Sequence, residues 1–497
     1  MILLDGSSLT LDQLEQIARH DAPVGLTAAA RDAVRAARAV VDAHAALPTA
    51  VYGINTGFGA LAEVPIAADQ LAALQLNLIR SHAAGVGEPL PRATVRAIMT
   101  LRANVLAKGH SGIRLETLEA LLALLNAGVT PVVPARGSVG ASGDLAPLAH
   151  LALVLVGEGA TLPGPTLASA GLAPVTLGPK EGLALINGTQ ASAGTLALVV
   201  RDAERLTQAA DLAAAMSVDA LRGSARPFDA RIHAVRAVPG QADAAANLRG
   251  LLDGSAINAS HVHCGKVQDA YALRCVPQVH GSAREAVAFA RRLVEIEANS
   301  ATDNPMVFAD SGDIVSGGNF HGAPIALAAD TLAIGLAQLA TISERRTDRM
   351  MTPHESGLPA FLIRDSGLNS GLMMAHVTAA ALASEIKGLA HPAAVDTIPT
   401  SAGREDHVSM SMAAALKVAR VAEFTTQILA IELLAASQAI DLLAPLATST
   451  PLAAVHGVIR RQVPFLDVDR TPAPDIAALA QLIADGALQR ACPMPLR

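Results

Sequence analysis

Apolar positions along the chain recur mostly at the spacing of helices that bury one face or more. Leu115–Asn126 illustrates the pattern, because its leucines recur every three or four residues and Gly128 follows as a stop signal. Similar patterns predict helices over 27–47, 91–107, 144–156, 193–216, 283–298, 326–350, 371–390 and 411–441. Several of these exceed twenty residues, which favours a mainly α fold, a bundle of long helices, over a βαβ array.

Strand signals are few and short. Met306–Phe308 and Ile314–Ser316 flank the turn residues 310–313, which predicts a small hairpin. Residues 159–180 contain four prolines and several glycines without a period, so we expect a surface connection there. We expect a smaller N-terminal domain over residues 1–190 and a long-helix domain over residues 191–497.

Composition excludes several classes of protein. The chain has 497 residues, of which 51% are apolar and 16% charged, so it can bury a large core and is not globally disordered. Its net charge of −7, without a Lys/Arg-rich block, argues against a nucleic-acid partner. Polar residues interrupt the apolar runs and no basic region precedes one at the N-terminus, so we expect neither a membrane span nor a signal peptide. Three cysteines suggest reduced thiols and a cytoplasmic protein.

A glycine-rich segment, Gly137–Leu145, precedes a strongly apolar helix and admits three interpretations. In the first interpretation, the segment is a flexible helix entry with Asp144 in the first turn, where the helix dipole favours a carboxylate. In the second interpretation, the segment is a phosphate-binding loop, although its glycines do not fit the usual phosphate-binding motifs. Or it modifies itself: Gly143 N attacks the Ala141 carbonyl, and loss of two waters, one carrying the Ser142 hydroxyl, leaves a ring with an exocyclic methylene. That ring is an electrophile that no standard side chain supplies.

Residues 137–148 resemble the signature of the ammonia-lyases that use a methylidene-imidazolone (MIO) group, a family that also includes aminomutases. Further similar segments follow in the family's order at residues 51–59, 184–190, 266–278, 300–305, 317–321 and 396–410. The resemblance implies a mainly α homotetramer whose active sites draw residues from three subunits. It also implies that MIO forms autocatalytically from Ala141, Ser142 and Gly143, without an external cofactor.

The reaction implied by the resemblance removes ammonia from an α-amino acid. Bonding of the amine to the methylene makes the amine a better leaving group, and a general base takes the β-proton. Tyr52 is the base that the resemblance implies. Because a phenol has a pKa of about 10, we expect the site to lower the pKa of Tyr52.

Five other residues acquire roles from the same resemblance. Gln268, Tyr271 and Arg274 are spaced by three, so we expect them on one face of a helical turn. Arg274 would bind the substrate carboxylate in a bidentate fork, and Gln268 and Tyr271 would support the electrophile and the substrate. Asn187 would contact the carboxylate and help to form or hold the ring, and Phe320 would be the pocket aromatic near it.

The residues that would meet the substrate side chain favour L-histidine, with trans-urocanate and ammonia as products. Ser81-His82 is similar to the pair in histidine ammonia-lyases, and Glu405 would accept a hydrogen bond from the imidazole. Met373 would line the same pocket. The alternatives are a phenylalanine or tyrosine ammonia-lyase or a 2,3-aminomutase of the same family, and a non-catalytic helical scaffold.

Several positions depart from the histidine-lyase pattern. Gly403-Arg404 replaces the usual Asn-Gln, and Arg404 could engage the neighbouring Glu405. His376 stands where the family has Gln. The sequence around Cys264 also differs, at Val262, His263 and Gly265. The run from His261 to Cys264 resembles a metal-ligand cluster, but no second carboxylate or CxxC pair completes it, so we expect no metal.

Overall fold

The computed structural model describes the whole chain except residues 48, 263–264 and 266. The chain divides into two compact units, each discontinuous in sequence. Unit 1 comprises Met1–Arg201, Ala290–Asp330 and Pro392–Leu416, and unit 2 comprises Asp202–Phe289, Thr331–His391 and Lys417–Arg497. Each unit is built from three segments, whereas the boundary expected near residue 190 would divide the chain at one point. The division into residues 1–190 and 191–497 therefore stays a prediction.

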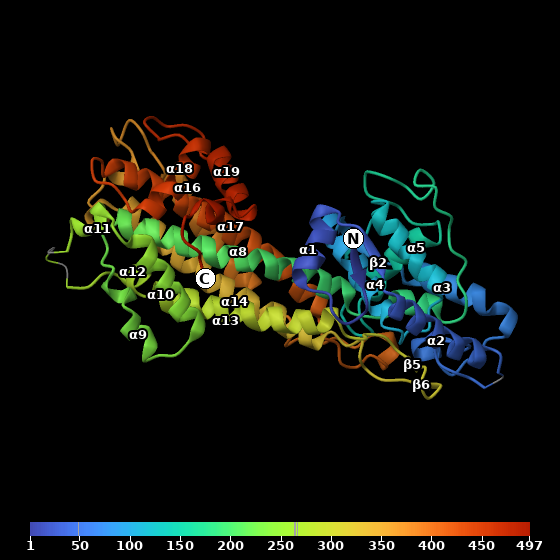
Figure 1. Ribbon diagram of the computed structural model, residues 1–497. Helices are drawn as coiled ribbons and strands as arrows, with labels where there is room; N and C mark the ends of the chain where they lie inside the picture. Colours follow the sequence, from blue (N-terminus) through green and yellow to red (C-terminus); the bar gives the residue numbers. More distant parts are fainter. Residues whose placement is uncertain (48, 263–264, 266) are drawn as a thin grey trace. The chain divides into compact units, whose positions relative to one another are not determined.

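Helices dominate both units (Figure 1). In chain order they are α1 (Leu11–His20), α2 (Ala28–Ala45), α3 (Leu71–His82), α4 (Arg92–Ala107), α5 (Leu115–Asn126), α6 (Leu145–Leu155), α7 (Glu181–Ile186), α8 (Gln190–Ala220), α9 (Ala230–Ala234), α10 (Pro239–Leu252), α11 (Ala256–Ala259), α12 (Tyr271–Arg274), α13 (Val276–Ala298), α14 (Ala323–Met351), α15 (Pro353–Ser356), α16 (Met373–Leu389), α17 (Ser411–Leu442), α18 (Thr450–Gln462), α19 (Ala473–Ala484) and α20 (Ala487–Ala491). The mainly α prediction is therefore confirmed.

Local sequence signals account for several helix boundaries. The Thr27 side chain accepts a hydrogen bond from Ala30 N and caps α2. Helix α5 begins and ends where its leucine pattern predicts. Helix α14 is long and apolar enough to cross a membrane by length and composition alone, but 67% of its apolar window is buried inside the protein. That burial is typical of a core helix.

Within the described part of the chain, the strands form three two-stranded sheets. β1 (Ile2–Leu4) pairs in parallel with β2 (Val24–Leu26), and β3 (Val86–Pro89) pairs antiparallel with β4 (Pro134–Arg136). β5 (Met306–Phe308) and β6 (Asp313–Val315) form the predicted hairpin. β4 ends directly before the glycine-rich segment Gly137–Leu145.

A buried polar network connects long helices within unit 2. The carboxylate of Glu432 accepts hydrogen bonds from the Ser217 and Ser343 hydroxyls, each at 2.6 Å, and from Arg346 Nη2 at 2.9 Å. All four side chains are buried. Because a buried charge is costly unless it is paired, these bonds favour one alignment of α8, α14 and α17.

Candidate functional site

The glycine-rich segment of unit 1 is held on one side by residues that precede α17. The Gly140 carbonyl accepts a hydrogen bond from Ser409 Oγ at 2.8 Å, and Met410 N donates to the Val139 carbonyl at 2.8 Å. Ala141 packs against Met410. Gly140 has a φ of +66°, and a Cβ there would lie 2.3 Å from Ser409 Oγ, so this close approach requires glycine.

The turn between α7 and α8 holds the other side of the segment. Asp144 N donates to the Gly188 carbonyl at 2.7 Å, and Gly143 forms a β-bridge with Gly188. Gly143 has a φ of +75°, and a Cβ there would lie 2.3 Å from Gly188 O. Asn187 Nδ2 donates to the Ser142 carbonyl at 2.9 Å. Ser142 and Gly143 are therefore fixed against Asn187 and Gly188.

Asp144 does not sit in the first turn of α6, as the helix-entry interpretation supposed, but at the N-cap position. Its buried carboxylate makes no cap hydrogen bond to α6 and instead accepts from Ser138 Oγ at 2.7 Å and from the Ser192 amide and hydroxyl at 2.7 and 2.8 Å. Burial raises the pKa of Asp144 above its ordinary value. The entry to α6 is thus held by specific contacts.

Arg102 of α4 supports the Asn187 turn, and sequence reasoning missed it. Its buried guanidinium donates through Nη1 to the Asn187 carbonyl at 2.8 Å and to Gln190 Oε1 at 2.6 Å, and through Nη2 to the Ala184 carbonyl. Desolvation lowers the pKa of Arg102 to about 10, so it stays charged at neutral pH. An arginine inside the apolar helix α4 was the available signal.

Glu405 lies against the residue expected to become the electrophile. Ser142 Oγ donates to Glu405 Oε1 at 2.7 Å, and the Thr400 hydroxyl donates to the other carboxylate oxygen. Arg404, expected to compete for Glu405, instead has Nη2 3.8 Å from Glu63 Oε1, with both side chains exposed. The carboxylate of Glu405 thus faces Ser142 rather than its neighbour in sequence.

Tyr52 is half-buried close to Glu405. Its hydroxyl accepts a weak hydrogen bond from Gly59 N at 3.5 Å, and its ring meets Phe58 edge-on with centroids 6.3 Å apart. Burial raises the pKa of Tyr52, the Gly59 bond opposes that shift, and the negative charge of Glu405 adds to it. In the single chain the pKa of Tyr52 is thus raised rather than lowered, because the phenolate is desolvated next to another anion, and the lowering expected of the assembled site stays a prediction.

His82, at the end of α3, has a defined tautomer. Its Nδ1 lies 2.8 Å from the Leu78 carbonyl, which only accepts, so Nδ1 carries the proton and Nε2 is an acceptor. Burial lowers the pKa of His82, although the Leu78 bond and the charge of Glu405 oppose the shift. The lowered pKa favours the neutral ring, whose Nε2 can accept an N–H from a ligand.

The remaining candidates of unit 1 and unit 2 are placed as follows. Phe320 is half-buried in the turn before α14. Tyr271 and Arg274 lie on α12 of unit 2, with the guanidinium carbon 4.6 Å from the phenol centroid. Arg274 Nε is buried and has no hydrogen-bond partner among the described residues. Met373 is half-buried at the start of α16, also in unit 2.

Gln268 does not share a helical face with Tyr271 and Arg274, so that prediction is wrong. Helix α12 begins only at Tyr271, because Ala270 is extended with φ −61° and ψ 157°, and Gln268 lies in the preceding loop. A spacing of three residues aligns side chains only where the backbone is helical.

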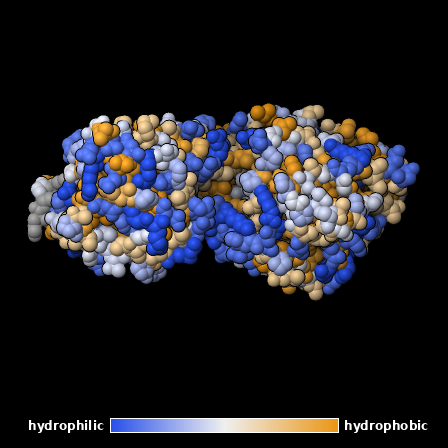
Figure 2. Space-filling view, turned by 90° about the horizontal axis from the view of Figure 1, so that it is seen from above, coloured by the Kyte–Doolittle hydropathy of each residue, from blue (hydrophilic) through white to orange (hydrophobic). Residues whose placement is uncertain are grey.

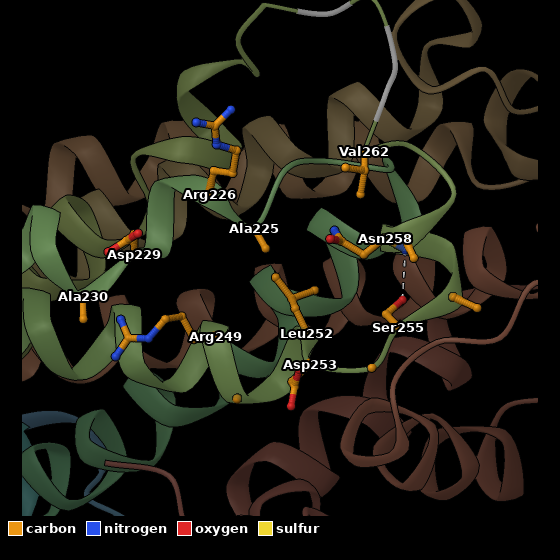
Figure 3. A pocket seen from close by; sticks show the side chains of 14 residues that line it. Ala225, Arg226, Asp229, Ala230, Arg249, Leu252, Asp253, Ser255, Asn258 and Val262 are labelled. Atoms are coloured by element: carbon orange, nitrogen blue, oxygen red, sulfur yellow. Dashed lines mark hydrogen bonds between the residues drawn. The ribbon is translucent and has the colours of Figure 1, made fainter.

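Several pockets open in this part of unit 2. One of about 1010 Å³ is lined by Arg226, Asp229, Arg249 and Asp253 among others, and contains none of the expected site residues (Figure 3). Another, of about 900 Å³, includes Gln268 and Arg274 in its wall. A smaller pocket of about 290 Å³ has Gln268 but not Arg274 in its wall. Of these three pockets, the one of about 900 Å³ therefore contains both candidate residues.

The departure at His376 belongs to an ion-pair cluster of unit 2. His376 Nε2 lies 3.0 Å from Glu344 Oε1, and Arg345 holds the same carboxylate. Burial alone would raise the pKa of Glu344, but the hydrogen bonds from His376 and Arg345 outweigh it and lower the value to about 2. His376 therefore has a structural partner in place.

This depressed pKa predicts a pH dependence of stability. Because the folded pKa of Glu344 is about 2 and its ordinary value is 4.5, its contribution is fully present above pH 4.5 and is lost as pH falls toward 2. We expect Glu344→Gln to lower the urea midpoint at pH 7 and to flatten its decline on acidification. Glu385→Gln, on an exposed carboxylate, should change neither; equal effects would contradict the assignment.

The possible metal-ligand run from His261 to Cys264 includes residues 263 and 264, which lie outside the described residues. Among the residues that the structure describes, no group of three or more His, Cys, Asp or Glu side chains is placed to hold a metal ion.

Comparison with known proteins shows the family to which the chain belongs. A family model of aromatic amino acid lyases matches residues 9–461. The histidine ammonia-lyase of Anaeromyxobacter dehalogenans is 57% identical, over 98% of this chain and 99% of its own. The crystal structure of histidine ammonia-lyase from Trypanosoma cruzi superposes with a TM-score of 0.92 at 46% identity, covering 99% of this chain and 94% of that one. A tyrosine aminomutase from Streptomyces globisporus gives 0.95 at 38% identity, covering both chains fully. The chain belongs to the aromatic amino acid lyase family.

Proposed function

We propose that this chain is a histidine ammonia-lyase, a carbon-nitrogen lyase that converts L-histidine to trans-urocanate and ammonia. The observation that carries the proposal is the 2.7 Å hydrogen bond between Ser142 Oγ and Glu405 Oε1. It brings a carboxylate suited to an imidazole N–H to the residue from which the electrophile would form. The high identity to relatives named histidine ammonia-lyase supports the same substrate.

The 141–143 segment fits an autocatalytically formed MIO group. Gly143 has a φ of +75°, which glycine adopts without a steric penalty, and the Asn187 amide already holds the Ser142 carbonyl. Asn187 Oδ1 is buried without a partner among the described residues, which leaves an acceptor beside the segment. The group would supply an electrophile that makes the substrate amine a better leaving group, and no external cofactor is needed.

The chain's own side chains would bind the substrate and move its proton. Tyr52 takes the β-proton, and Arg274 binds the carboxylate together with Asn187. His82 Nε2 accepts one imidazole N–H and Glu405 binds the other nitrogen when it is protonated. The supporting residues Tyr271 and Gln268 and the pocket walls Phe320 and Met373 complete the proposed set.

We propose a cytoplasmic homotetramer with active sites shared between subunits. Apolar side chains are exposed among polar ones on the face shown in Figure 2, and individual exposed side chains of α16 and α12 support assembly. Met374 and Val377 of α16 are 58% and 48% exposed, and Tyr271 is 71% exposed although it is expected to act on substrate. Exposed apolar surface of this kind is typical of protein–protein contacts.

A substrate panel on the purified wild-type protein tests the proposed reaction. Each of histidine, phenylalanine and tyrosine is supplied in turn, and urocanate, cinnamate, coumarate and β-amino acids are quantified. We expect urocanate to form fastest. Faster cinnamate or coumarate, or a β-amino acid as main product, would favour the other family activities, and no turnover at all would favour a non-catalytic scaffold.

The tautomer of His82 predicts a specificity change. We expect His82→Leu to lower kcat/KM for histidine by about 10- to 100-fold, because the lost hydrogen bond leaves an imidazole N–H unpaired. His44→Leu is the matched control, since His44 makes the same bond to the carbonyl four residues earlier, at 2.9 Å, on α2. Unchanged kinetics for His82→Leu would show that His82 does not bind the substrate.

A further inference from the structure

The contact between Ser142 and Glu405 can exist only in the immature chain. Ser142 Oγ is one of the atoms lost as water when the MIO ring forms, so its bond to Glu405 Oε1 plays no part in later turnover. The carboxylate is nevertheless aimed at this atom, and the Thr400 hydroxyl fixes its second oxygen. Paired in this way, Glu405 is positioned for chemistry on Ser142 itself.

We propose that Glu405 is the acid–base residue of MIO maturation and delivers the proton with which the Ser142 hydroxyl leaves. This role rests on the proposed function, because it requires that the segment matures. It is separate from the later contact between Glu405 and the substrate imidazole.

The two dehydrations balance without an added reagent. In the first, Gly143 N bonds to the Ala141 carbonyl carbon. That carbonyl oxygen then leaves as water with the protons of Gly143 N and Ser142 N, as a C=N bond forms. In the second, Glu405 takes the proton from Ser142 Cα, the C–H electron pair forms the Cα=Cβ bond, and the Cβ–Oγ pair leaves with Oγ. Glu405 returns the proton to Oγ, which departs as water, and Glu405 ends as a carboxylate.

Neighbouring groups support this assignment. Asn187 Nδ2 donates to the Ser142 carbonyl at 2.9 Å, which stabilises negative charge next to Cα and makes its proton easier to remove. Asp144, the nearest carboxyl in sequence, is already bonded to Ser138 and to Ser192. Glu405 is the carboxyl that the structure bonds to the leaving oxygen.

The order of events follows from the geometry. While Ser142 Oγ is present, it occupies one oxygen of Glu405, and Thr400 occupies the other. Departure of Oγ as water frees Oε1. The same carboxylate oxygen that faces Ser142 Oγ before maturation can therefore face an imidazole N–H once Oγ has left.

A time course of intact mass tests the proposal. The full-length chain is made by cell-free synthesis, quenched in acid at intervals and weighed by mass spectrometry. Wild type should become lighter by two waters. In Glu405→Gln, the species lighter by one water should accumulate, with the second loss slowed about 100-fold or more, because general acid–base catalysis contributes that much. Glu405→Asp should restore part of the rate. Arg404→Gln, the matched control beside it, should mature like wild type, since Arg404 faces Glu63.

The outcomes separate this proposal from the function on which it rests. Loss of both waters from Glu405→Gln at the wild-type rate overturns the maturation role and leaves the lyase proposal intact. A wild-type chain that keeps its encoded mass overturns both. If circular dichroism shows that Glu405→Gln does not fold, Thr400→Val decides: a slower second loss supports the role, because Thr400 only orients Glu405, and an unchanged rate overturns it.

Discussion

Ser142→Ala is expected to lose turnover of histidine by at least about 1,000-fold, which corresponds to about 4 kcal/mol of transition-state stabilisation. Alanine has no hydroxyl to lose, so the exocyclic methylene cannot form and the substrate amine remains a poor leaving group. The fold should survive, because the contacts that fix the segment use the backbone of Gly140 and Ser142 and the carboxylate of Asp144. Helical content and molecular mass in solution should equal those of wild type.

The control for Ser142→Ala is Ser169→Ala, in the exposed proline-rich connection, where the same chemical change should leave kcat and KM unaltered. Wild-type kcat in Ser142→Ala would show that the reaction does not depend on a modified serine. Loss of activity together with loss of helix would indicate unfolding, and the thermal transition distinguishes that case.

Tyr52→Phe is expected to lower kcat by about 100- to 10,000-fold, the range usually contributed by a general base. The ring and its edge-on contact with Phe58 remain, and the hydrogen bond that disappears, from Gly59 N at 3.5 Å, is weak. Stability should therefore change little. KM should change less than kcat, because the hydroxyl takes part in proton transfer in the transition state rather than in substrate binding.

The pH profile gives Tyr52→Phe a second readout. A base must be deprotonated, so the rate should rise with pH through the pKa of Tyr52, and this rise should be absent from the residual activity of the variant. Burial and the charge of Glu405 raise the pKa of Tyr52 in the single chain. We therefore expect assembly to bring a cation or further hydrogen-bond donors to the phenol. A Tyr52→Phe enzyme with wild-type kcat and the same pH profile would contradict the role.

Periodicity predicted the long helices because their packing repeats along the chain. The leucines of α5 set its limits, and the apolar runs of α8, α14 and α17 identified them as helices. The same reasoning failed at Gln268, because a helix as short as α12 does not show a repeating apolar pattern in its sequence. This helix begins only after Ala270, whose backbone is extended.

Contacts between distant parts of the chain could not be predicted from local pattern. Ser142 and Glu405 are 263 positions apart, and Arg102 is 85 positions from Asn187. Proximity in sequence was misleading in one case, because it suggested a contact between Arg404 and Glu405, whereas Arg404 faces Glu63. Motifs identified which residues matter, but only the folded backbone shows which of them touch.

Formation of the MIO group is measured directly by the mass of the peptide that contains residues 141–143, released by proteolysis of the purified wild-type protein. We expect a peptide lighter than the encoded sequence by two waters, with fragment ions that place the loss at Ala141, Ser142 and Gly143. A peptide of unmodified mass, from protein that converts histidine to urocanate, would contradict this expectation.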